Sequence, residues 1–526
     1  MARRLFDGGF HGRQAGQARV LPHVASVLVA ALVFALVYPP FGVGSLAFLA
    51  LAPITLVFLD PALPCSLLRA ASAGLAFGLL AAMAIVGPWM TTASIDYFDR
   101  STAWSLGFTL LVNATNVALF YAPAFGALRL LATATPLLRA VGAASTWIAF
   151  ELLRANVLLG NAWALLGQGV GDIPLMREAA AFGGVWTLGW AAAMAGAALG
   201  VALQPGLPRR DVVRCALLGA SAPILLALLG FASRGGDAAS TSLETLRVAV
   251  VQAEIASRDV WDPARRLEHW NTYVAMTSKL EPGSVDLVVW PESAVPFLLD
   301  ADVSSRRKLA SLAGNLGAAI LLGAPRSQAT SDGEAVLHNS VYFFPADGRE
   351  PLFYDKRRLL PFVETMPAAL GGLPLTTRYE AGRAAASFEV RGWRIAPLLC
   401  FEAVYPDYAR EAVLGGADLL VNLSNDAWFA RGAGPEQHFA MSVLRAAELR
   451  RPMVRAANGG ISGAVGPDME NLGPMLRREK GVRVYEIAPP EGVTTVTAAW
   501  GDAVGWAAVV VSALALFLSR RRTHTA

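Results

Sequence analysis

The sequence predicts a polytopic α-helical membrane bundle of about eight spans joined to one α/β domain outside the membrane. Two observations predict this combination. The chain of 526 residues is 55% hydrophobic and only 16% charged, whereas soluble domains carry about 25% charged residues. The apolar excess is confined to residues 1–233 and to one segment near the C-terminus, and the residues between them alternate short β-branched runs with helix-like stretches.

Eight apolar segments approach the roughly 20 residues that a helix needs to cross a bilayer. The second and the last of these segments are short. They comprise residues 23–39, 43–59, 68–89, 104–128, 140–159, 182–203, 213–232 and 504–518.

The arginines are distributed unevenly between the loops that join these segments. One alternate set of loops and ends holds most of them, and the opposite short loops hold little beyond Arg100 and Arg177. Basic loops remain in the cytoplasm, so we expect both termini there and the segment between spans seven and eight outside. A cleavable signal peptide is the alternative for the basic N-terminus, although further spans follow at once. The basic positions are Arg3, Arg4, Arg13, Arg19, Arg69, Arg129, Arg139, Arg209, Arg210, Arg214, Arg520, Arg521 and Arg522.

The chain is therefore expected to contain six regions. They are a cytoplasmic basic N-terminus at 1–22, a membrane domain of seven spans at 23–233, a linker at 234–245, an extramembrane domain on the periplasmic side at 246–500, a last span at 503–519 and a cytoplasmic tail at 520–526.

Two charged residues, Glu151 and Arg154, fall within the fifth span. Charges inside a membrane span are costly and are usually paired or functional. Their spacing of three residues allows an ion pair within the helix. The alternative is a contact with a lipid head group or with the substrate.

The extramembrane region reads as one α/β domain with a largely buried sheet. The dipeptide Asp262-Pro263 is a plausible helix start, because proline is favoured in the first turn. We expect strands at 246–252, 285–290, 318–323, 339–344, 395–399, 417–422 and 453–457, and helices at 263–280, 304–316, 407–414 and 436–450.

Three short runs in this domain each place one reactive side chain just beyond an apolar run, where α/β folds build active sites. The side chains are those of Glu292, Lys356 and Cys400. Together they can perform acyl transfer, since the carboxylate takes the thiol proton, the thiolate attacks a carbonyl and the ammonium stabilises the oxyanion. The ammonium is also expected to lower the pKa of the thiol from its usual value of about 8.5.

Each of these residues also has a purely structural interpretation. Cys400 is the only cysteine of the domain, so no disulfide framework is expected, and it could be a buried packing residue. Lys356 stands beside two arginines and could belong to a solvated basic patch, although the apolar run 359–362 argues against this. Glu364 follows that run and could orient Lys356 by pairing with it.

Other chemistries find little support. A Cys–His protease would need His338 or His438 to meet Cys400 in space, which remains open. The histidines are not spaced as metal ligands, and we find neither a Cys-x-x-Cys pair nor a phosphate-binding loop, so no metal or other cofactor is expected. The formal charge of +4 is explained by cytoplasmic arginines and does not argue for nucleic acid.

The three runs resemble the motifs of the nitrilase (carbon–nitrogen hydrolase) superfamily, whose catalytic residues are Glu, Lys and Cys in that order. With seven spans before the domain and one after it, the whole chain resembles the apolipoprotein N-acyltransferase family. The matching segments are 38–42, 251–252, 261–262, 290–292, 359–362, 423–429, 445–446, 451–452, 455–456 and 460–462, with Lys356, Glu364, Cys400, Glu402, His438 and Glu448.

The resemblance implies an α-β-β-α sandwich for the nitrilase-like domain and a role for each matching residue. It implies that Cys400 is the nucleophile, Glu292 the general base and Lys356 the residue that stabilises the oxyanion. Glu364 and Glu402 resemble supporting acidic residues of the pocket. Trp261, Phe401 and Trp428 are assigned to the substrate and lipid entrance, with Trp261 on a mobile arm.

The implied reaction passes a phospholipid acyl chain to Cys400 as a thioester, and then to the α-amino group of the S-diacylglyceryl cysteine that begins a bacterial lipoprotein. The enzyme would be a monomer in the bacterial inner membrane and would need no cofactor. Two alternatives remain: a membrane-anchored nitrilase-type amidase or lipid deacylase, and a non-catalytic membrane scaffold.

Two positions near the expected pocket depart from the family pattern. Phe401 stands where a tyrosine is usual, and Val363 replaces a glycine before Glu364. Phe401 lacks a hydroxyl and Val363 adds bulk, so the departures leave open a specialised paralogue with another acyl donor or acceptor.

Overall fold

A computed structural model describes residues 4–233, 243–329, 335–365, 379–429, 432–490 and 492–523 of the chain. The chain forms two compact units. The first comprises Met1–Thr91, Ala103–Ala232 and Asp502–Ala526, and the second comprises Thr92–Thr102 and Ser233–Gly501. Most of the expected linker, 234–245, lies outside the described residues.

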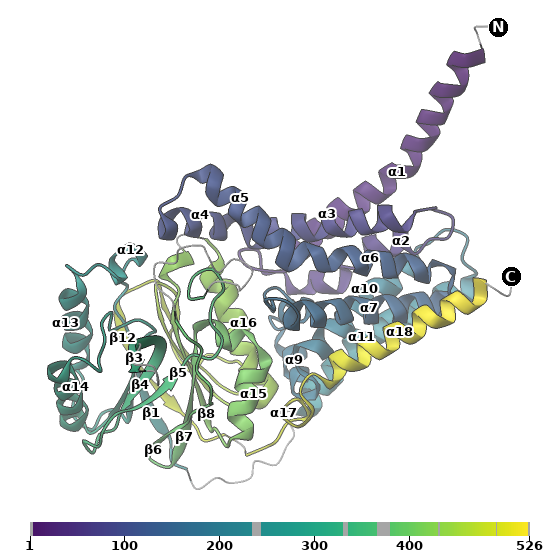
Figure 1. Cartoon of the computed structure of the whole chain (residues 1–526). Helices are drawn as coiled ribbons and strands as arrows, with labels where there is room; N and C mark the ends of the chain where they lie inside the picture. The colour runs from purple at the N-terminus through teal and green to yellow at the C-terminus, as the bar shows by residue number, and fades with distance from the viewer. Residues whose placement is uncertain are drawn as a thin grey trace. The chain divides into compact units, whose positions relative to one another are not determined.

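The first unit is α-helical (Figure 1). Five of its described helices are long and apolar enough to cross a membrane. They are Leu67–Ile85, Thr102–Thr133, Gly184–Ala202, Arg209–Ser233 and Ala503–Arg521. The helices of this unit are α1 (Arg4–Leu36), α2 (Ala52–Phe58), α3 (Leu67–Ile85), α5 (Thr102–Asn113), α6 (Leu119–Leu130), α7 (Pro136–Asn156), α8 (Leu166–Val170), α9 (Pro174–Arg177), α10 (Gly184–Ala202), α11 (Arg209–Ser233) and α18 (Ala503–Thr523). Helix α4 (Gly87–Phe98) begins in the first unit, and its residues from Thr92 onward belong to the second.

The other three expected spans coincide with helical segments that are shorter or more polar. Two of them are the apolar stretches Val20–Leu36 and Gly44–Phe58. The third is α7, in which Arg139, Glu151 and Arg154 are all buried. Each expected span overlaps a helical segment, but five of the described helices have the length and composition of a membrane span, and the count of eight stays a prediction.

Glu151 and Arg154 do not form the ion pair that their spacing suggests; each binds the backbone of the segment after α7 instead. Arg154 donates to the carbonyls of Trp163, over 2.8 Å, and Ala164, over 3.2 Å. Glu151 accepts hydrogen bonds from the backbone N–H of Leu166. Buried backbone groups outside regular structure need such partners, which explains why the charges turn toward the loop.

The second unit contains two six-stranded sheets (Figure 1). Their strand orders are β12-β1-β2-β3-β4-β5 and β11-β10-β9-β8-β7-β6. In each sheet three adjacent strands are parallel, β1–β2–β3 in the first and β7–β8–β9 in the second, and antiparallel strands flank them. The strands are β1 (Leu246–Gln252), β2 (Leu287–Val289), β3 (Ala319–Ala329), β4 (Ala335–Phe344), β5 (Leu352–Asp355), β6 (Phe388–Val390), β7 (Trp393–Leu399), β8 (Leu419–Asn425), β9 (Met453–Asn458), β10 (Ile461–Val465), β11 (Leu476–Arg477) and β12 (Gly481–Ile487).

Three apolar clusters hold the layers of this unit together. One cluster draws residues from both sheets, among them Val250 and Leu321 of the first and Val421 of the second. The other face of the first sheet packs on α13 (Arg266–Thr277) and α14 (Val303–Leu316). The other face of the second packs on α15 (Pro406–Leu414) and α16 (Gly434–Leu449), and Figure 1 shows the two helix pairs on opposite sides of the sheets.

All seven expected strands and all four expected helices of this unit overlap observed elements. The expected helix start at Asp262-Pro263 is wrong. Asp262 caps a turn, where its Oδ1 accepts a hydrogen bond from Ala264 N, and α13 begins only at Arg266. Strands β5, β6, β10, β11 and β12 were not expected from the sequence.

Candidate active site

The topology brings the three reactive residues to the ends of strands from both sheets. Glu292 follows β2, Lys356 follows β5 directly, and Cys400 follows β7 directly. All three side chains are buried, with 5%, 2% and 4% of their residues' surface exposed. Lys356 therefore does not belong to a solvated basic patch.

The turn that carries Glu292 lies tightly against strand β3. Ser293, the next residue, has φ 57°, in the left-handed region. A Cβ atom added to Gly323 of β3 would lie 2.5 Å from Cα of Glu292. Only glycine fits at that position, so the sequence of β3 helps to decide where the carboxylate lies.

Lys356 lies between two carboxylates. Its Nζ is 3.0 Å from Oε1 of Glu292 and 2.9 Å from Oε2 of Glu364, which is the pairing with Glu364 that the sequence suggested. Asn339 bridges the same carboxylates, since its Nδ2 donates to Oε1 of Glu292 over 2.8 Å and to Oε1 of Glu364 over 2.6 Å. Burial alone would lower the pKa of Lys356, but the two carboxylates together raise it well above its usual value, and the amine is charged.

A backbone N–H group also binds Oε2 of each carboxylate. Oε2 of Glu292 accepts a hydrogen bond from Asn425 N over 2.9 Å. Oε2 of Glu364 accepts one from Leu360 N over 2.7 Å. Both carboxylates are therefore held in place before any substrate arrives.

Glu402 is fully buried and binds backbone N–H groups and the Tyr354 hydroxyl rather than Lys356. Its Oε2 accepts a hydrogen bond from Leu399 N, over 2.7 Å, next to Cys400. Its Oε1 accepts bonds from the Tyr354 hydroxyl, over 2.8 Å, and from the N–H groups of Arg357 and Arg358. Burial raises the pKa of Glu402. Glu402 thus ties the end of β5 to the end of β7.

Cys400 begins the short helix η6 (Cys400–Val404) with a φ of 48°. Burial and the neighbouring Glu292 raise the pKa of its thiol, and Lys356 lowers it by less. Lys356 thus lowers the pKa of the thiol as expected, but burial in an apolar setting disfavours the thiolate more strongly. The thiol is protonated at rest and needs a base.

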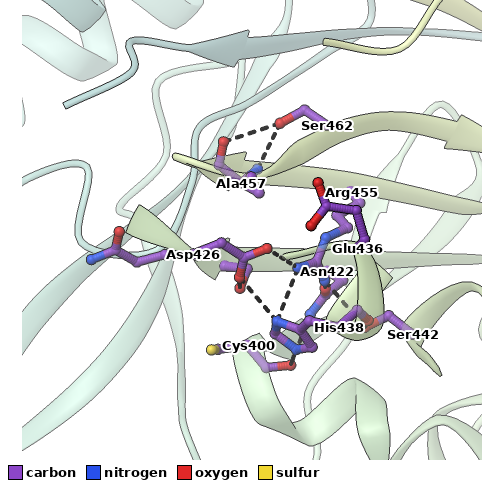
Figure 2. A network of polar contacts seen from close by, with 12 residues as sticks. Cys400, Asn422, Asp426, Glu436, His438, Ser442, Arg455, Ala457 and Ser462 are labelled. Carbon is purple, nitrogen blue, oxygen red and sulfur yellow. Dashed lines mark hydrogen bonds and ion pairs between the residues drawn. The ribbon is translucent and has the colours of Figure 1, made fainter. Parts of the chain in front are cut away.

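His438 contacts the backbone of Cys400 and not its sulfur. Its Nε2 lies 3.2 Å from the carbonyl oxygen of Cys400, and its Nδ1 lies 2.9 Å from Oδ1 of Asp426. Figure 2 shows the sulfur pointing away from the ring. His338, the other candidate, places its Nδ1 2.9 Å from the carbonyl of Glu380. Neither contact is that of a Cys–His pair, in which a ring nitrogen must reach the sulfur.

The sequence assigned no role to three further side chains of this region, Asn339, Asn422 and Arg455. They lie on β4, β8 and β9 respectively, and the other residues of these strands are mostly apolar. A polar side chain on a buried strand needs partners there, and this interruption of an apolar run is the sequence signal that could have identified them.

The residues assigned to a lipid entrance are only partly buried. Trp261 ends the short helix α12 (Ser257–Val260) and is 42% exposed. Phe401 packs edge-to-face on Tyr405, and Trp428 stacks on Phe429 with ring centroids 4.0 Å apart. Their role at an entrance stays a prediction.

The two sheets and the buried site define the class of this protein as a carbon–nitrogen hydrolase fold, and the family model described as "Carbon-nitrogen hydrolase" matches residues 247–495. The model described as "Apolipoprotein N-acyltransferase N-terminal domain" matches residues 30–198. The apolipoprotein N-acyltransferase of Azotobacter vinelandii is 32% identical, over 89% of each chain. That of Brucella suis is 30% identical, over 93% of this chain and 94% of the relative. The chain belongs to the apolipoprotein N-acyltransferase family.

The chain is also similar to solved structures. One is XC1258 from Xanthomonas campestris, a CN-hydrolase superfamily protein, at 22% identity and a TM-score of 0.37. That match covers 47% of this chain and 91% of the other.

Proposed function

We propose that this bacterial inner-membrane N-acyltransferase works through a thioester on Cys400, formed from a phospholipid and resolved by the α-amino group of an S-diacylglyceryl cysteine. Its family establishes the activity, lipoprotein N-acylation. The observation that carries the mechanism is the buried cluster of Glu292, Lys356 and Glu364, which acts electrostatically on the Cys400 thiol.

In the first half-reaction, Glu292 takes the proton of the Cys400 thiol as the sulfur attacks an ester carbonyl of the phospholipid. A base is needed because the pKa of this thiol is raised. The C–S bond forms, the C–O bond to the glycerol breaks, and the proton passes from Glu292 to the departing alkoxide. The products are the acyl-enzyme and a lysophospholipid. The thiol proton ends on the lysophospholipid hydroxyl, and Glu292 is again ionised.

In the second half-reaction, the α-amino group of the lipoprotein attacks the thioester. Its proton goes to Glu292, the C–N bond forms and the C–S bond breaks. The departing thiolate takes the proton back from Glu292, which restores the resting site. An amine rather than water resolves the acyl-enzyme, and this distinguishes the transferase from a hydrolase that shares the first step.

Lys356 is proposed to bind the oxyanion in both half-reactions. An ammonium group has three N–H donors, and Glu292 and Glu364 accept two of them in the resting site. The third is then available for the tetrahedral intermediate, where a buried charge is most effective. Glu364 and Glu402 are supporting residues, the first by orienting Lys356 and the second by tying its strand to that of Cys400.

The arrangement in the membrane is also a proposal. We infer eight crossings, with both termini in the cytoplasm and the domain at 246–500 on the periplasmic side as a four-layered α-β-β-α sandwich. The other regions are the cytoplasmic N-terminus at 1–22, the seven spans at 23–233, the linker at 234–245, the last span at 503–519 and the cytoplasmic tail at 520–526. Alternating arginine-rich loops support this topology. The working unit is a monomer, and Trp261, Phe401 and Trp428 line the lipid entrance.

A product assay tests the transferase against the hydrolase. The purified protein in detergent micelles is incubated with a phospholipid that carries labelled acyl chains and with a synthetic S-diacylglyceryl-cysteine peptide. We expect the label in an amide on the peptide, and none in the same reaction with Cys400→Ala. Label released only as free fatty acid would contradict the proposal and favour a lipid deacylase.

A further inference from the structure

The backbone of Cys400 adopts a conformation that an L-residue does not hold on its own. Its φ is 48° where strand β7 turns into η6, and a non-glycine residue in the left-handed region is sterically unfavourable. Such a conformation persists only where its surroundings hold it. The groups that bind the backbone of Cys400 therefore decide where its sulfur lies.

Two buried side chains meet the carbonyl oxygen of Cys400. The Nε2 atom of His438 lies 3.2 Å from it and the Nδ2 atom of Asn422 lies 3.3 Å from it. The same amide nitrogen donates to the carbonyl of Leu398 over 2.9 Å, so Asn422 also holds the end of the strand. Figure 2 shows the His438 ring on the side of the carbonyl oxygen, with the sulfur directed away. Both side chains thus act on the position of the thiol.

One guanidinium group connects these two donors (Figure 2). Arg455 extends from β9 and is 1% exposed. Its Nη1 donates to Oδ1 of Asn422 and, over 3.1 Å, to the hydroxyl of Ser442. Its Nη2 donates to Oδ2 of Asp426 over 2.7 Å and lies 3.1 Å from Nδ1 of His438. The planar fork of an arginine fixes several partners in one geometry.

The partners also indicate where the hydrogen of the His438 ring lies. Nε2 faces a carbonyl oxygen, which only accepts, so Nε2 carries the hydrogen. Nδ1 lies 2.9 Å from Oδ1 of Asp426 and 3.1 Å from Nη2 of Arg455, so both groups of the ion pair hold this side of the ring. Burial and the charge of Arg455 lower the pKa of His438, and Asp426 opposes this shift. Asp426 is held by Arg455 and by the Ser424 hydroxyl, which donates to its Oδ1 over 2.7 Å.

We propose that Arg455, His438 and Asn422 are positioning residues for the Cys400 nucleophile: the guanidinium orients two buried donors, and these fix the carbonyl of Cys400 and with it the direction of the thiol. The inference rests on the proposed role of Cys400 in acyl transfer. It gives His438 no part in moving the substrate's protons, although a histidine so close to a reactive cysteine would normally be taken for the base.

Pairs of substitutions test whether the N–H donor itself is needed or only a side chain of similar size at that position. His438→Gln keeps an N–H near the position of Nε2, and His438→Leu removes it. Asn422→Asp keeps the contact with Arg455 but turns an acceptor toward the Cys400 carbonyl. A displacement of about 1 Å in a reacting group can cost roughly 100-fold in rate, so we expect His438→Leu and Asn422→Asp to slow thioester formation by about that factor. His438→Gln should stay within roughly 10-fold of the unsubstituted protein.

Arg451→Met is the matched control for loss of a buried arginine. Arg451 lies four residues before Arg455, and its hydrogen bonds go to backbone carbonyls such as those of Ala417 and Val493. It contacts neither Asn422 nor His438 in the described part of the chain. Its replacement should lower the unfolding temperature without a specific loss of acylation, whereas Arg455→Met should lower both.

The measurement uses the full-length protein in detergent micelles, with Cys65→Ala and Cys215→Ala so that only Cys400 can react. Single-turnover thioester formation from palmitoyl-oleoyl-phosphatidylethanolamine is followed by quenched intact mass spectrometry between pH 6 and 9. We expect the rate to fall in His438→Leu with the half-saturating lipid concentration unchanged, and the pH profile of His438→Gln to superimpose on that of the unsubstituted protein. A His438→Gln protein as slow as His438→Leu, or one lacking a limb of the pH profile, would overturn the proposal. The proposal would also be overturned if the rate of thioester formation fell in every variant, Arg451→Met included, only as far as the unfolding temperature fell.

Alkylation of Cys400 by iodoacetamide provides a readout that needs no acyl transfer. Its rate should change at least about 10-fold in Asn422→Asp and His438→Leu and little in His438→Gln, because displacement of the thiol alters its access and its contact with Glu292. Unchanged alkylation in the first two variants would contradict the inference. If the unsubstituted protein forms no thioester at all, the proposed function fails, and the alkylation rates still decide the positioning role. If His438→Leu does not fold, Asn422→Asp and His438→Gln carry the comparison.

Discussion

At the scale of single residues, the resting site keeps its charges on Lys356 and its two carboxylates, and the Cys400 thiol carries none. Burial and Glu292 raise the pKa of Cys400, while Lys356 stays charged between two carboxylates. A protonated thiol outside the reaction is protected from oxidants, which attack the thiolate. The reactive form then arises only when Glu292 removes the proton during attack on a substrate.

Glu292→Gln is expected to affect two reactions of Cys400 in opposite directions. Loss of the base should slow thioester formation by roughly 10²–10⁴-fold. Loss of the negative charge removes one cause of the raised thiol pKa, so the thiolate fraction and the rate of iodoacetamide alkylation at pH 9 should rise. Both rates are measured on the same preparation. Parallel decreases would mean that Glu292 only supports the structure.

Lys356→Met should destabilise the protein as well as inactivate it. The substitution leaves the buried carboxylates of Glu292 and Glu364 without their cation, and an unpaired buried charge costs about 3–5 kcal/mol. Adding Glu364→Gln to Lys356→Met removes one of the two charges and should restore part of the unfolding temperature but no activity. Thermal unfolding of both variants measures this. Equal unfolding temperatures for the single and double variants would contradict the coupling.

The three reactive residues were predictable from the sequence, but most of their partners were not. Glu292, Lys356 and Cys400 each follow an apolar run, which is a local signal. Asn339 reaches its carboxylates from a strand 47 residues away from Glu292 in the chain. Contacts of this kind depend on sheet order, which a single sequence does not display.

At the scale of secondary-structure elements, Glu402 makes the connection between β5 and β7 on which the site depends. It accepts hydrogen bonds from Leu399 beside Cys400 and from Tyr354 and Arg357 on either side of Lys356. The acceptor carboxylate is fully buried, so the two strand ends cannot separate without leaving it unpaired.

Glu402→Gln tests this connection with an isosteric side chain. The amide turns N–H donors toward backbone N–H groups, and an unsatisfied buried group costs about 1–3 kcal/mol. We expect a lower unfolding temperature and slower thioester formation with the lipid requirement unchanged. Glu411→Gln is the control, because Glu411 also binds Arg357 but is 55% exposed, and exposed ion pairs contribute about 0–1 kcal/mol. Similar effects in the two variants would show that Glu402 has no special role.

The central strands were predicted from the sequence because they are continuous apolar runs buried on both faces. The missed strands lack that signal. Strand β12 alternates polar and apolar residues along its edge position, with Arg483 and Glu486 paired against β1. Strand β5 has four residues, and β11 has two. The false helix start at Asp262-Pro263 arose because an Asx turn and a helix cap share the same residue preferences.

At the scale of the whole molecule, the first unit buries charged side chains of one of its helices. Arg139, Glu151 and Arg154 of α7 are buried and hydrogen-bonded within the unit. These charged residues lower the mean hydropathy of α7, which is not among the five helices with the composition of a membrane span. The two other expected spans outside the five, Val20–Leu36 and Gly44–Phe58, are apolar but short.

Single cysteines in a protein without Cys65 and Cys215 test the proposed topology. Arg210 lies in the first turn of α11 and its side chain is 77% exposed, and Glu389 of β6 is exposed in the second unit. With Cys400→Ala also present, a cysteine at position 389 should react with an impermeant maleimide added to intact spheroplasts. A cysteine at position 210 should react only after permeabilisation. Labelling of both positions from the same side would mean that α11 does not cross the membrane.

The most direct test of the central claim is the intact mass of the purified protein after incubation with phospholipid, beside Cys400→Ala. We predict a mass increase of one acyl chain on the unsubstituted protein alone, sensitive to hydroxylamine as a thioester is, and removed when an S-diacylglyceryl-cysteine peptide is added. The absence of an adduct with every phospholipid tried, or an equal adduct on Cys400→Ala, would contradict a thioester on Cys400.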